Sequence, residues 1–439
     1  MIAPSTKEPG TFSWQRWLVA TLLTALVACA PLYIAPTDRA TEPTESARAE
    51  GLVYAFGDMG EPTRGFGDVT RSIAKELHTD RASGDVSMSP LLLALGDNLY
   101  PKGLPRPESG HTEPVTRLAR LAELLATCQF GEHPAPLVLV PGNHDYANRA
   151  LARDRDEGDI TRWYYLDALE VAGVAHWTML PGERPEDVPD AATLYTRLYE
   201  TPEQLVEFMR PRRIPHTPAS IAIVAIDSQL LIDLFDTGRE DLADRYLDTL
   251  DAELARAASA RWRVVAMHHP LESFGAHRVT IPGRFLLGPG WRQFGSPWDA
   301  VLAVPPLGIV ATTARWAVAS PQDLHASANR AYREAVLTRL ARHDAPLVLS
   351  GHDHNSQLIE LTPPGAKRPM LQLVTGEAAK TDPVTRGAGT LFYHSGHGYA
   401  RLAVYGTHLE IAFRDRSGET LYRYRLEDGR MDASGANGR

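Results

Sequence analysis

An α/β fold is predicted for this chain of 439 residues by two features that recur along it. Short apolar runs bounded by turn residues, such as Leu52–Phe56 and Leu91–Leu95, have the length of strands that are buried on both faces. Amphipathic stretches with apolar residues at helical spacing lie between these runs. Strands that alternate with helices in this way are typical of the α/β class.

Two apolar stripes at intervals of three and four residues predict long helices. The first stripe consists of Leu242, Tyr246, Leu247, Leu250 and Leu254, and the second of Leu324, Ala328, Tyr332, Val336 and Leu340. Near the C-terminus the pattern changes to alternation, which predicts an antiparallel meander. Its three strands are expected at Tyr399–Tyr405, Leu409–Arg414 and Leu421–Leu426.

Composition excludes several classes of protein. Hydrophobic residues make up 44% of the chain, which is ordinary for a globular protein and excludes a disordered or fibrous one. The net charge of −9 argues against nucleic acid as a partner. Two cysteines, Cys29 and Cys128, cannot form a disulfide framework. Cys128 continues the helical spacing of Val115, Leu118, Leu121 and Leu125, so we expect a buried small hydrophobe rather than a reactive thiol.

The first 30 residues have the character of an export signal or lipoprotein anchor. An uncharged apolar run of 12 residues, Trp17–Ala28, fits a signal-peptide core and is short for a membrane-spanning helix. It ends in Leu26-Val27-Ala28-Cys29, which resembles a bacterial lipobox with Cys29 as the lipidated residue. Ordinary cleavage at Ala30, an uncleaved signal anchor and coincidence stay open as alternatives. We expect export to the periplasm or the extracellular face, with attachment to the membrane through the anchor or the lipid.

The rest of the chain is predicted to form one domain with a linker and a tail. Residues 31–50 are rich in Thr, Glu, Ala and Pro and predict a flexible linker. The domain is expected at 51–427, followed by a disordered tail at 428–439. Long stretches near 151–220 and 274–320 are predicted insertions. The second is interpreted as an active-site lid, a surface resting on the membrane, or a packed decoration.

Five apolar runs each end in residues that bind cations. In chain order these residues are Asp58 after 52–56, Asp97 after 91–95, Asn143-His144-Asp145 after 137–140, His268 after 264–267, and His352-Asp353-His354 after 347–349. Sites in α/β sheets form just beyond the carboxyl ends of strands, so these side chains are expected together. Two carboxylates there would repel each other unless cations were present. Carboxylate and imidazole ligands suit Mn, Fe or Zn, and the set predicts a two-metal site.

At these residues the chain resembles the calcineurin-like metallophosphoesterases, and within them the purple acid phosphatases, including the tartrate-resistant type. The broad family begins with Asp-x-His, whereas this chain has Asp58-Met59-Gly60 and lacks that His. Purple acid phosphatases share this loss and replace the ligand with a Tyr in the second block, which here is Tyr100. The remaining blocks that match are Gly142-Asn143-His144-Asp145, Val265-Ala266-Met267-His268 and Gly351-His352-Asp353-His354.

The resemblance implies a four-layer α/β/β/α sandwich of two mixed sheets flanked by helices. It also implies a pair of metal ions, Fe(III) and a divalent Fe, Zn or Mn. Fe(III) would be held by Asp58, Asp97, Tyr100 and His354, with Asp97 bridging. The divalent ion would be held by Asn143, His268 and His352. A hard trivalent cation suits a phenolate, because it removes the proton of a phenol whose ordinary pKa is about 10.

The resemblance further implies hydrolysis of phosphate monoesters by a metal-activated water. His144 would bind phosphate and protonate the leaving oxygen, Asp145 would orient His144, and His277 is a candidate second acid. A small phosphate ester is the expected substrate. A phosphodiesterase or nucleotidase on the same metals is the nearest alternative, since the five blocks do not set the ester type. A scaffold lipoprotein with a degenerate site is the non-enzymatic alternative, which the complete set of ligand types disfavours.

Overall fold

The computed structural model describes residues 48–84, 86, 88–103, 113–146, 151, 176–178, 201–215, 217–278 and 320–427. All of them belong to one compact unit formed by Pro36–Arg278 and Ala319–Arg439. The predicted export signal at 1–30, nearly all of the linker and the tail at 428–439 lie outside the described residues. So do most of the two predicted insertions.

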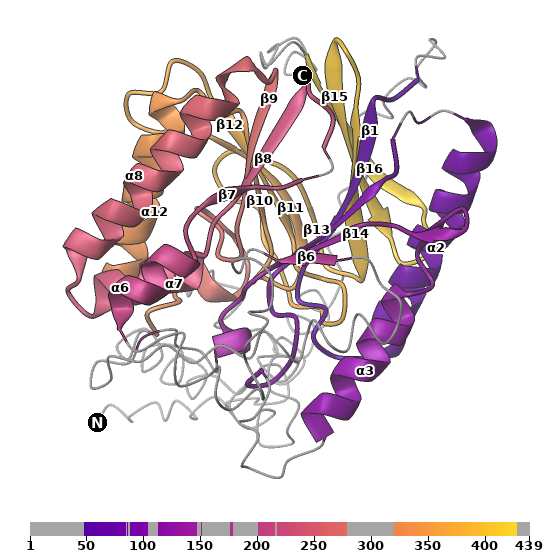
Figure 1. Ribbon diagram of the computed structural model, residues 1–439, viewed down its shortest axis with the longest axis horizontal. Helices are drawn as coiled ribbons and strands as arrows, with labels where there is room; N and C mark the ends of the chain where they lie inside the picture. The colour runs from indigo at the N-terminus through magenta and orange to yellow at the C-terminus, as the bar shows by residue number, and fades with distance from the viewer. Residues whose placement is uncertain are drawn as a thin grey trace, which may run out of the picture. The chain divides into compact units, whose positions relative to one another are not determined.

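Two mixed sheets dominate the part of the chain that the structure describes, and each contains seven strands (Figure 1). The order in the first sheet is β16 (Thr420–Glu427), β15 (His408–Asp415), β14 (Gly398–Val404), β1 (Gly51–Phe56), β2 (Leu91–Leu95), β5 (Leu137–Val140) and β6 (His176–Thr178). The order in the second is β13 (Thr390–His394), β11 (Ser356–Leu361), β12 (Met370–Thr375), β10 (Leu347–Ser350), β9 (Trp262–Ala266), β8 (Ile221–Ala225) and β7 (Arg212–Arg213). A short hairpin joins β3 (Gln129–Phe130) to β4 (His133–Pro134).

The central strands of both sheets run parallel, which brings their carboxyl ends to one edge. In the first sheet β1 pairs with β2, and β2 with β5, in parallel register. In the second sheet β8, β9, β10 and β12 also pair in parallel. The antiparallel strands lie toward the margins, where β14, β15 and β16 form the C-terminal meander. Residues that follow β1, β2, β5, β9 and β10 therefore emerge at corresponding edges.

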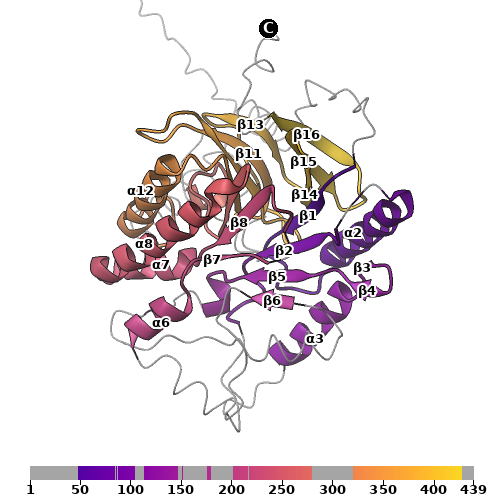
Figure 2. The same ribbon diagram turned by 45° about the horizontal axis from the view of Figure 1, so that its top comes forward.

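Helices cover the outer faces of the two sheets, as both views show (Figure 2). The first sheet is covered by α2 (Arg64–Ser83) and α3 (Glu113–Leu125). The second is covered by α7 (Ser228–Asp236), α8 (Glu240–Arg256) and α12 (Ser327–Arg342), with α6 (Pro202–Phe208) near its β7 edge. Three single turns complete the described elements: η2 (His144–Tyr146), η3 (Ala257–Ser259) and η4 (Ala276–Arg278). The predicted α/β/β/α sandwich of two mixed sheets is confirmed.

Strand β1 illustrates why the runs are apolar on both faces. Its side chains alternate, so Val53 and Ala55 join the core that contains the second sheet. Leu52, Tyr54 and Phe56 join the other core, beneath α2 and α3. All of these side chains are buried, and burial of each large apolar one contributes about 1.5–3 kcal/mol. A strand enclosed in this way has little freedom, and it fixes the position of the residues that follow it.

The sequence predicted the main elements, with differences at some of their boundaries. All five apolar runs are strands, the stripe at 242–254 lies on α8, and the meander is present as β14, β15 and β16. Leu324, however, precedes α12 and belongs to a turn, although it is buried. Strands β8 and β12 were not predicted at all, although both are apolar runs. The run that contains β8 is followed directly by Asp227 and so carries the signal used for the other strands, but it was overlooked, whereas β12 is followed by Gly376 and Glu377.

Cys128 is buried, as predicted, but it lies beyond the end of α3 rather than on the helix. Its thiol donates to the carbonyl oxygen of Thr70. Burial raises the pKa of the Cys128 thiol to about 12, so it stays protonated and unreactive at neutral pH. Among the described helices, none combines the length and apolar character that a membrane crossing requires.

Candidate metal centre

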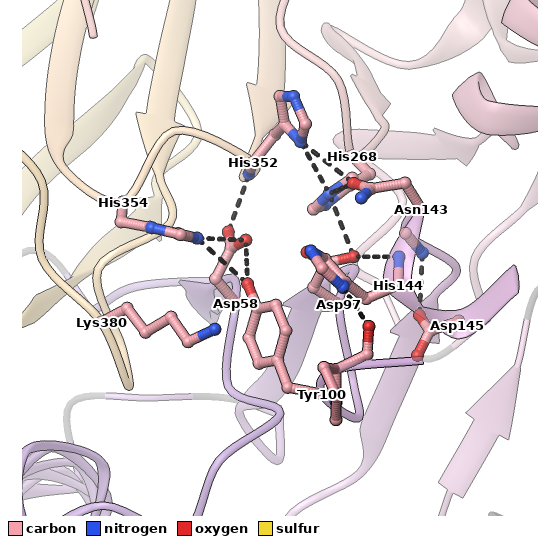
Figure 3. Close-up of polar contacts among 12 residues, drawn as sticks. Asp58, Asp97, Tyr100, Asn143, His144, Asp145, His268, His352, His354 and Lys380 are labelled. Atoms are coloured by element: carbon pink, nitrogen blue, oxygen red, sulfur yellow. Dashed lines mark hydrogen bonds and ion pairs between the residues drawn. The ribbon is translucent and has the colours of Figure 1, made fainter. Parts of the chain in front are cut away.

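The seven predicted metal ligands converge between the two sheets (Figure 3). The first sheet supplies Asp58 after β1, Asp97 and Tyr100 after β2, and Asn143 after β5. The second sheet supplies His268 after β9 and the pair His352 and His354 after β10. Six of the seven are buried, and the side chain of His354 is 18% exposed. Segments separated by up to about 300 residues thus meet at one point.

Three of these side chains form a first group around the Tyr100 hydroxyl. That hydroxyl donates to Asp58 Oδ1 at 2.8 Å and lies 3.1 Å from His354 Nε2. His354 Nε2 is also 3.4 Å from Asp58 Oδ1. A carboxylate oxygen, a phenol oxygen and an imidazole nitrogen therefore face a common point.

A second group surrounds the amide oxygen of Asn143. Asn143 Oδ1 lies 3.0 Å from His268 Nε2 and 3.1 Å from His352 Nδ1. The two imidazole nitrogens are 3.2 Å apart. One amide oxygen and two imidazoles thus form a second set of donors facing a common point.

Asp97 lies between the groups. Its Oδ1 is 3.3 Å from His268 Nε2 and accepts a hydrogen bond of 2.9 Å from the backbone N–H of His144. Single donor atoms of Asp58, Asp97 and His268 fall within 4.8 Å of one another. A carboxylate in this position can serve both sets of donors at once.

The backbone at three of these residues adopts an uncommon conformation. Asp58, Asp97 and His352 have φ values of 56°, 52° and 70°. Residues other than glycine adopt this left-handed backbone region at a cost of about 1–3 kcal/mol each. Residues strained in this way cluster at functional sites. At Asp58 and His352 the conformation is secured by hydrogen bonds: Asp58 N–H donates to Gly96 O at 3.0 Å, and His352 N–H donates to Asp58 Oδ2 at 2.7 Å.

Hydrogen bonds to the far nitrogens orient two of the imidazoles. His268 Nδ1 donates to the carbonyl oxygen of Leu95 at 2.7 Å, and His354 Nδ1 to Asp382 Oδ2 at 2.7 Å. In each case Nδ1 carries the hydrogen, and the lone pair of Nε2 points toward the other candidate metal ligands. Metal-binding histidines are typically fixed in this way.

The charges of the site are balanced only in part by the protein. Burial alone would raise the pKa of Asp97, but the charges of His268 and His144 outweigh burial and lower it below its usual range. Burial lowers the pKa of His268, whereas Asp97 raises it, with a net value of about 9. Burial, followed by the Asp58 carboxylate, raises the pKa of the Tyr100 phenol well above its ordinary value. A phenolate at Tyr100 therefore requires a nearby cation.

The predicted catalytic residues lie beside these groups. His144 Nε2 is 3.8 Å from Asp97 Oδ2, and the side chain of His144 is 28% exposed. The His277 ring packs on the His352 ring at 4.0 Å between centroids, and its Nδ1 is 3.4 Å from Asp323 Oδ1. Both imidazoles are accessible at the margin of the buried donor set.

Asp145 has contacts other than the predicted one. Its carboxylate accepts hydrogen bonds from the backbone N–H groups of Asn98, Leu99 and Gly142, and from the Asn98 amide. It therefore ties the loop after β2 to the loop after β5. The ring of His144 is held by the carbonyl oxygen of Pro101, with which its Nδ1 hydrogen-bonds.

Sequence reasoning did not identify two further residues at the site. Asp382 supports His354, as described above. The ammonium of Lys380 lies 3.2 Å from the centroid of the Tyr100 ring and 3.5 Å from Glu61 Oε1. Both residues lie in a loop after β12 that carries no recognisable motif, so only the folded chain brings them to the site.

Comparison with known proteins identifies the family. The model of the calcineurin-like phosphoesterase family matches residues 52–356, which is most of the chain. The chain belongs to the calcineurin-like phosphoesterases. No curated protein matched in a further search.

Solved structures similar to this calcineurin-like phosphoesterase include the following three. GAP50, the anchor in the inner membrane complex of Plasmodium, is 14% identical over 86% of this chain and 89% of its own, with a TM-score of 0.49. Purple acid phosphatase PPD1 from yellow lupin (Lupinus luteus) is 13% identical over 88% of this chain and 55% of its own, with a TM-score of 0.47. PhoD is 13% identical over 86% of this chain and 70% of its own, with a TM-score of 0.44.

Membership of the calcineurin-like phosphoesterases implies a phosphate ester substrate and a dinuclear metal site. The donor atoms described above fit such a site in number and kind, because buried carboxylate, amide and imidazole groups suit transition metals. His352 Nε2 and Asp353 Oδ2 are buried without a hydrogen-bond partner, which also marks the region as incomplete without a ligand.

Proposed function

We propose that this protein is a phosphatase of the purple acid type, which hydrolyses phosphate monoesters with Fe(III) and a divalent Fe, Zn or Mn. One observation carries the proposal. The Tyr100 hydroxyl lies 2.8 Å from Asp58 and 3.1 Å from His354, and the neighbouring Gly60 has no side chain to offer in place of the His of the broad family. A phenol buried among a carboxylate and an imidazole suits a hard trivalent cation.

In this proposal Asp58, Tyr100 and His354 hold Fe(III), Asn143, His268 and His352 hold the divalent ion, and Asp97 serves both. Metals held by these residues would supply Lewis-acid activation of a water and charge stabilisation of the phosphate. Protonation of the leaving oxygen is assigned to side chains of the protein.

His144 is suited to protonate the leaving oxygen. Because the carbonyl of Pro101 can only accept, Nδ1 of His144 carries a hydrogen, and Nε2 is the nitrogen that gains and loses a proton. The Asp97 carboxylate, 3.8 Å away, stabilises the protonated ring. A proton donated from Nε2 of an accessible imidazole is what departure of an alkoxide needs.

His277 is proposed as a second acid. Its Nδ1 faces Asp323 Oδ1 at 3.4 Å, and its backbone N–H donates to Asp353 Oδ1 at 3.2 Å. The ring lies over His352, one of the proposed ligands of the divalent ion. A leaving group too large to reach His144 could be protonated here.

A phosphodiesterase or nucleotidase remains the second candidate, because the metal donors are compatible with either ester. Asp97→Asn tests the proposal, with the exposed Asp241→Asn on α8 as the matched control. We expect loss of aryl monophosphate hydrolysis and of bound metal in Asp97→Asn only. Faster hydrolysis of an aryl diester than of the monoester by the wild type would favour the phosphodiesterase. Activity of Asp97→Asn within a few-fold of wild type would exclude the site.

We also propose that residues 1–30 direct export and that residues 31–50 tether the domain, 51–427, to a membrane. The composition of the first 30 residues supports this proposal. Cys29→Ser distinguishes the anchors. Release of the variant from membranes supports lipidation, whereas retention at the wild-type level supports an uncleaved signal anchor. A wild-type protein that is soluble after export supports cleavage at Ala30.

A further inference from the structure

A third imidazole lies beside the second group of donors. His269 follows His268 directly and is fully buried. Its Nδ1 lies 2.9 Å from the Ser228 hydroxyl, and its backbone N–H donates to the same oxygen at 2.9 Å. Ser228 is the first residue of α7, so the helix anchors this ring from the outer side of the sheet.

The three rings are arranged around a common point. The centroid of His269 is 4.9 Å from that of His268 and 4.3 Å from that of His352, and the latter two are 5.0 Å apart. One nitrogen from each ring can be chosen so that all three lie within 4.8 Å of one another. This set shares His268 with the trio of Asp58, Asp97 and His268 and differs from it in its other two members.

Nε2 of His269 lacks a hydrogen-bond partner. His269 Nε2 is buried and makes no hydrogen bond, and the same is true of His352 Nε2. Leaving a buried polar atom unpaired costs about 1–3 kcal/mol, so such atoms usually mark an unseen ligand, ion or water. An apolar side chain at position 269 would avoid the cost of burying an unpaired polar atom.

The hydrogen bond at Nδ1 of His269 determines which nitrogen of the ring is available to a ligand. His268 and His354 both have Nδ1 held by an oxygen acceptor and Nε2 directed at the site. At His269 the Ser228 hydroxyl engages Nδ1, and Nε2 is the nitrogen left without a hydrogen bond. In the tautomer in which Nδ1 donates to this hydroxyl, the ring offers the Nε2 lone pair to a cation.

We propose that His269 is an additional ligand, through Nε2, of the divalent ion held by Asn143, His268 and His352. The inference rests on the two-metal site of the proposed function. It makes the divalent position rich in imidazole, which favours Zn²⁺ or Fe²⁺ over the oxygen-seeking Mg²⁺. The divalent metal of this chain is then selected by a residue outside the five motif positions.

Two variants separate ligation from packing. His269→Asn keeps an amide at the position of Nδ1, where it can bond to Ser228, and removes the nitrogen at the position of Nε2. His269→Gln places an amide further out, at the position of Nε2. His78→Asn, an exposed substitution on α2, is the matched control. Each protein is loaded with one Fe(III) and one Zn²⁺ per chain and compared with the wild type.

Zinc affinity and zinc X-ray absorption are the readouts. In the wild type we expect three imidazoles per Zn²⁺. In His269→Asn we expect two, and zinc binding weakened by at least about tenfold, since loss of a residue that merely orients a ligand already costs about 10–100-fold. His269→Gln should bind zinc with intermediate affinity, and His78→Asn should match the wild type.

Two results would overturn the inference. Unchanged zinc affinity in His269→Asn would show that the ring makes no contribution. Weaker binding with an unchanged number of imidazoles would show that His269 orients a ligand without being one. Either result leaves the proposed function standing if the wild type binds two metals and hydrolyses esters. A wild type that binds no metal would overturn both proposals.

Discussion

The backbone of Tyr100 occupies the space in which a side chain at position 60 would begin. The Tyr100 N–H donates to Gly60 O at 3.0 Å. A Cβ atom added to Gly60 would lie 2.7 Å from that nitrogen, 2.8 Å from Asp97 O and 2.8 Å from the Leu99 Cα. The absence of a side chain at residue 60 and the presence of Tyr100 are therefore two parts of one local structure.

We predict that Gly60→Ala destabilises the protein by about 1–3 kcal/mol, because rigid backbone atoms on three sides cannot move away from an added methyl group. Urea unfolding measures the change. Gly67→Ala, within α2, is the control, because its Cβ would make contacts no closer than 3.6 Å. That control should be neutral or more stable by up to about 1 kcal/mol. Equal stability of Gly60→Ala and wild type would contradict the described packing.

Colour provides a test of the metal assigned to Tyr100. A phenolate bound to Fe(III) donates charge to the metal in a visible transition, so the oxidised protein should be pink to purple. Tyr100→Phe should abolish the visible band while Asp58 and His354 retain some iron. Absorption spectra and iron analysis of the same samples measure both quantities.

Tyr399→Phe is the control for this prediction. Tyr399 is also buried, but its hydroxyl bonds to Ser72 and Glu76 away from the site. The control should keep the wild-type colour. Iron-loaded protein without any visible band that depends on Tyr100 would return the chain to the colourless calcineurin-like phosphoesterases with Zn or Mn.

The sequence was sufficient to predict the strands that are followed by residues of metal-binding types. Burial on both faces of such a strand gives a clear apolar run in the sequence. Gly57-Asp58 and Gly96-Asp97 illustrate this, since each follows a fully buried strand. The resemblance, together with the absence of a side chain at Gly60, also drew attention to Tyr100, whose hydroxyl lies beside Asp58 and His354. For the strands the information is local, within a few residues of each motif.

Contacts made by residues outside the motifs could not be predicted. Lys380 reaches Tyr100, and Asp382 reaches His354, from a loop whose position depends on the second sheet. The hydrogen bonds of Asp145 could not be predicted for a similar reason. Its carboxylate accepts from the backbone N–H groups of Asn98 and Leu99 in a distant loop and of Gly142 in its own loop, and backbone partners leave no trace in the sequence.

Asp382 is predicted to support the iron position through His354. The two residues bond twice: His354 Nδ1 donates to Asp382 Oδ2, and the Asp382 N–H donates to His354 O at 2.7 Å. Asp382→Ala should weaken iron binding by about 10–100-fold, because the ring loses its orientation. Asp382→Asn retains an oxygen acceptor and should bind iron more tightly than the alanine variant.

Iron affinity and the position of the visible band are the measurements for Asp382. Asp241→Ala, exposed on α8, controls for loss of a carboxylate elsewhere. If both Asp382 variants bound iron as the wild type does, the hydrogen bond to His354 would have no positioning role.

Stability against pH is predicted to depend on Asp227, the N-cap of α7. Burial raises the pKa of this carboxyl from 3.8 to about 6, even though it accepts hydrogen bonds from Leu230 N–H and the Tyr146 hydroxyl. The Tyr246 hydroxyl bonds to its backbone N–H, and the charge of Asp145 adds to the upward shift. The folded state therefore binds a proton more tightly than the unfolded state.

It follows that this group lowers the free energy of unfolding as pH rises from about 4 to about 6, by an amount on the order of 3 kcal/mol, with no further change above that range. Asp227→Asn keeps the cap, since asparagine is as good an N-cap as aspartate, and removes the titration. The stability of the variant relative to wild type should therefore increase between pH about 4 and about 6 and then stay constant. Urea unfolding of both proteins across this range measures the difference. A difference that does not vary with pH would show that Asp227 has an ordinary pKa in the folded protein.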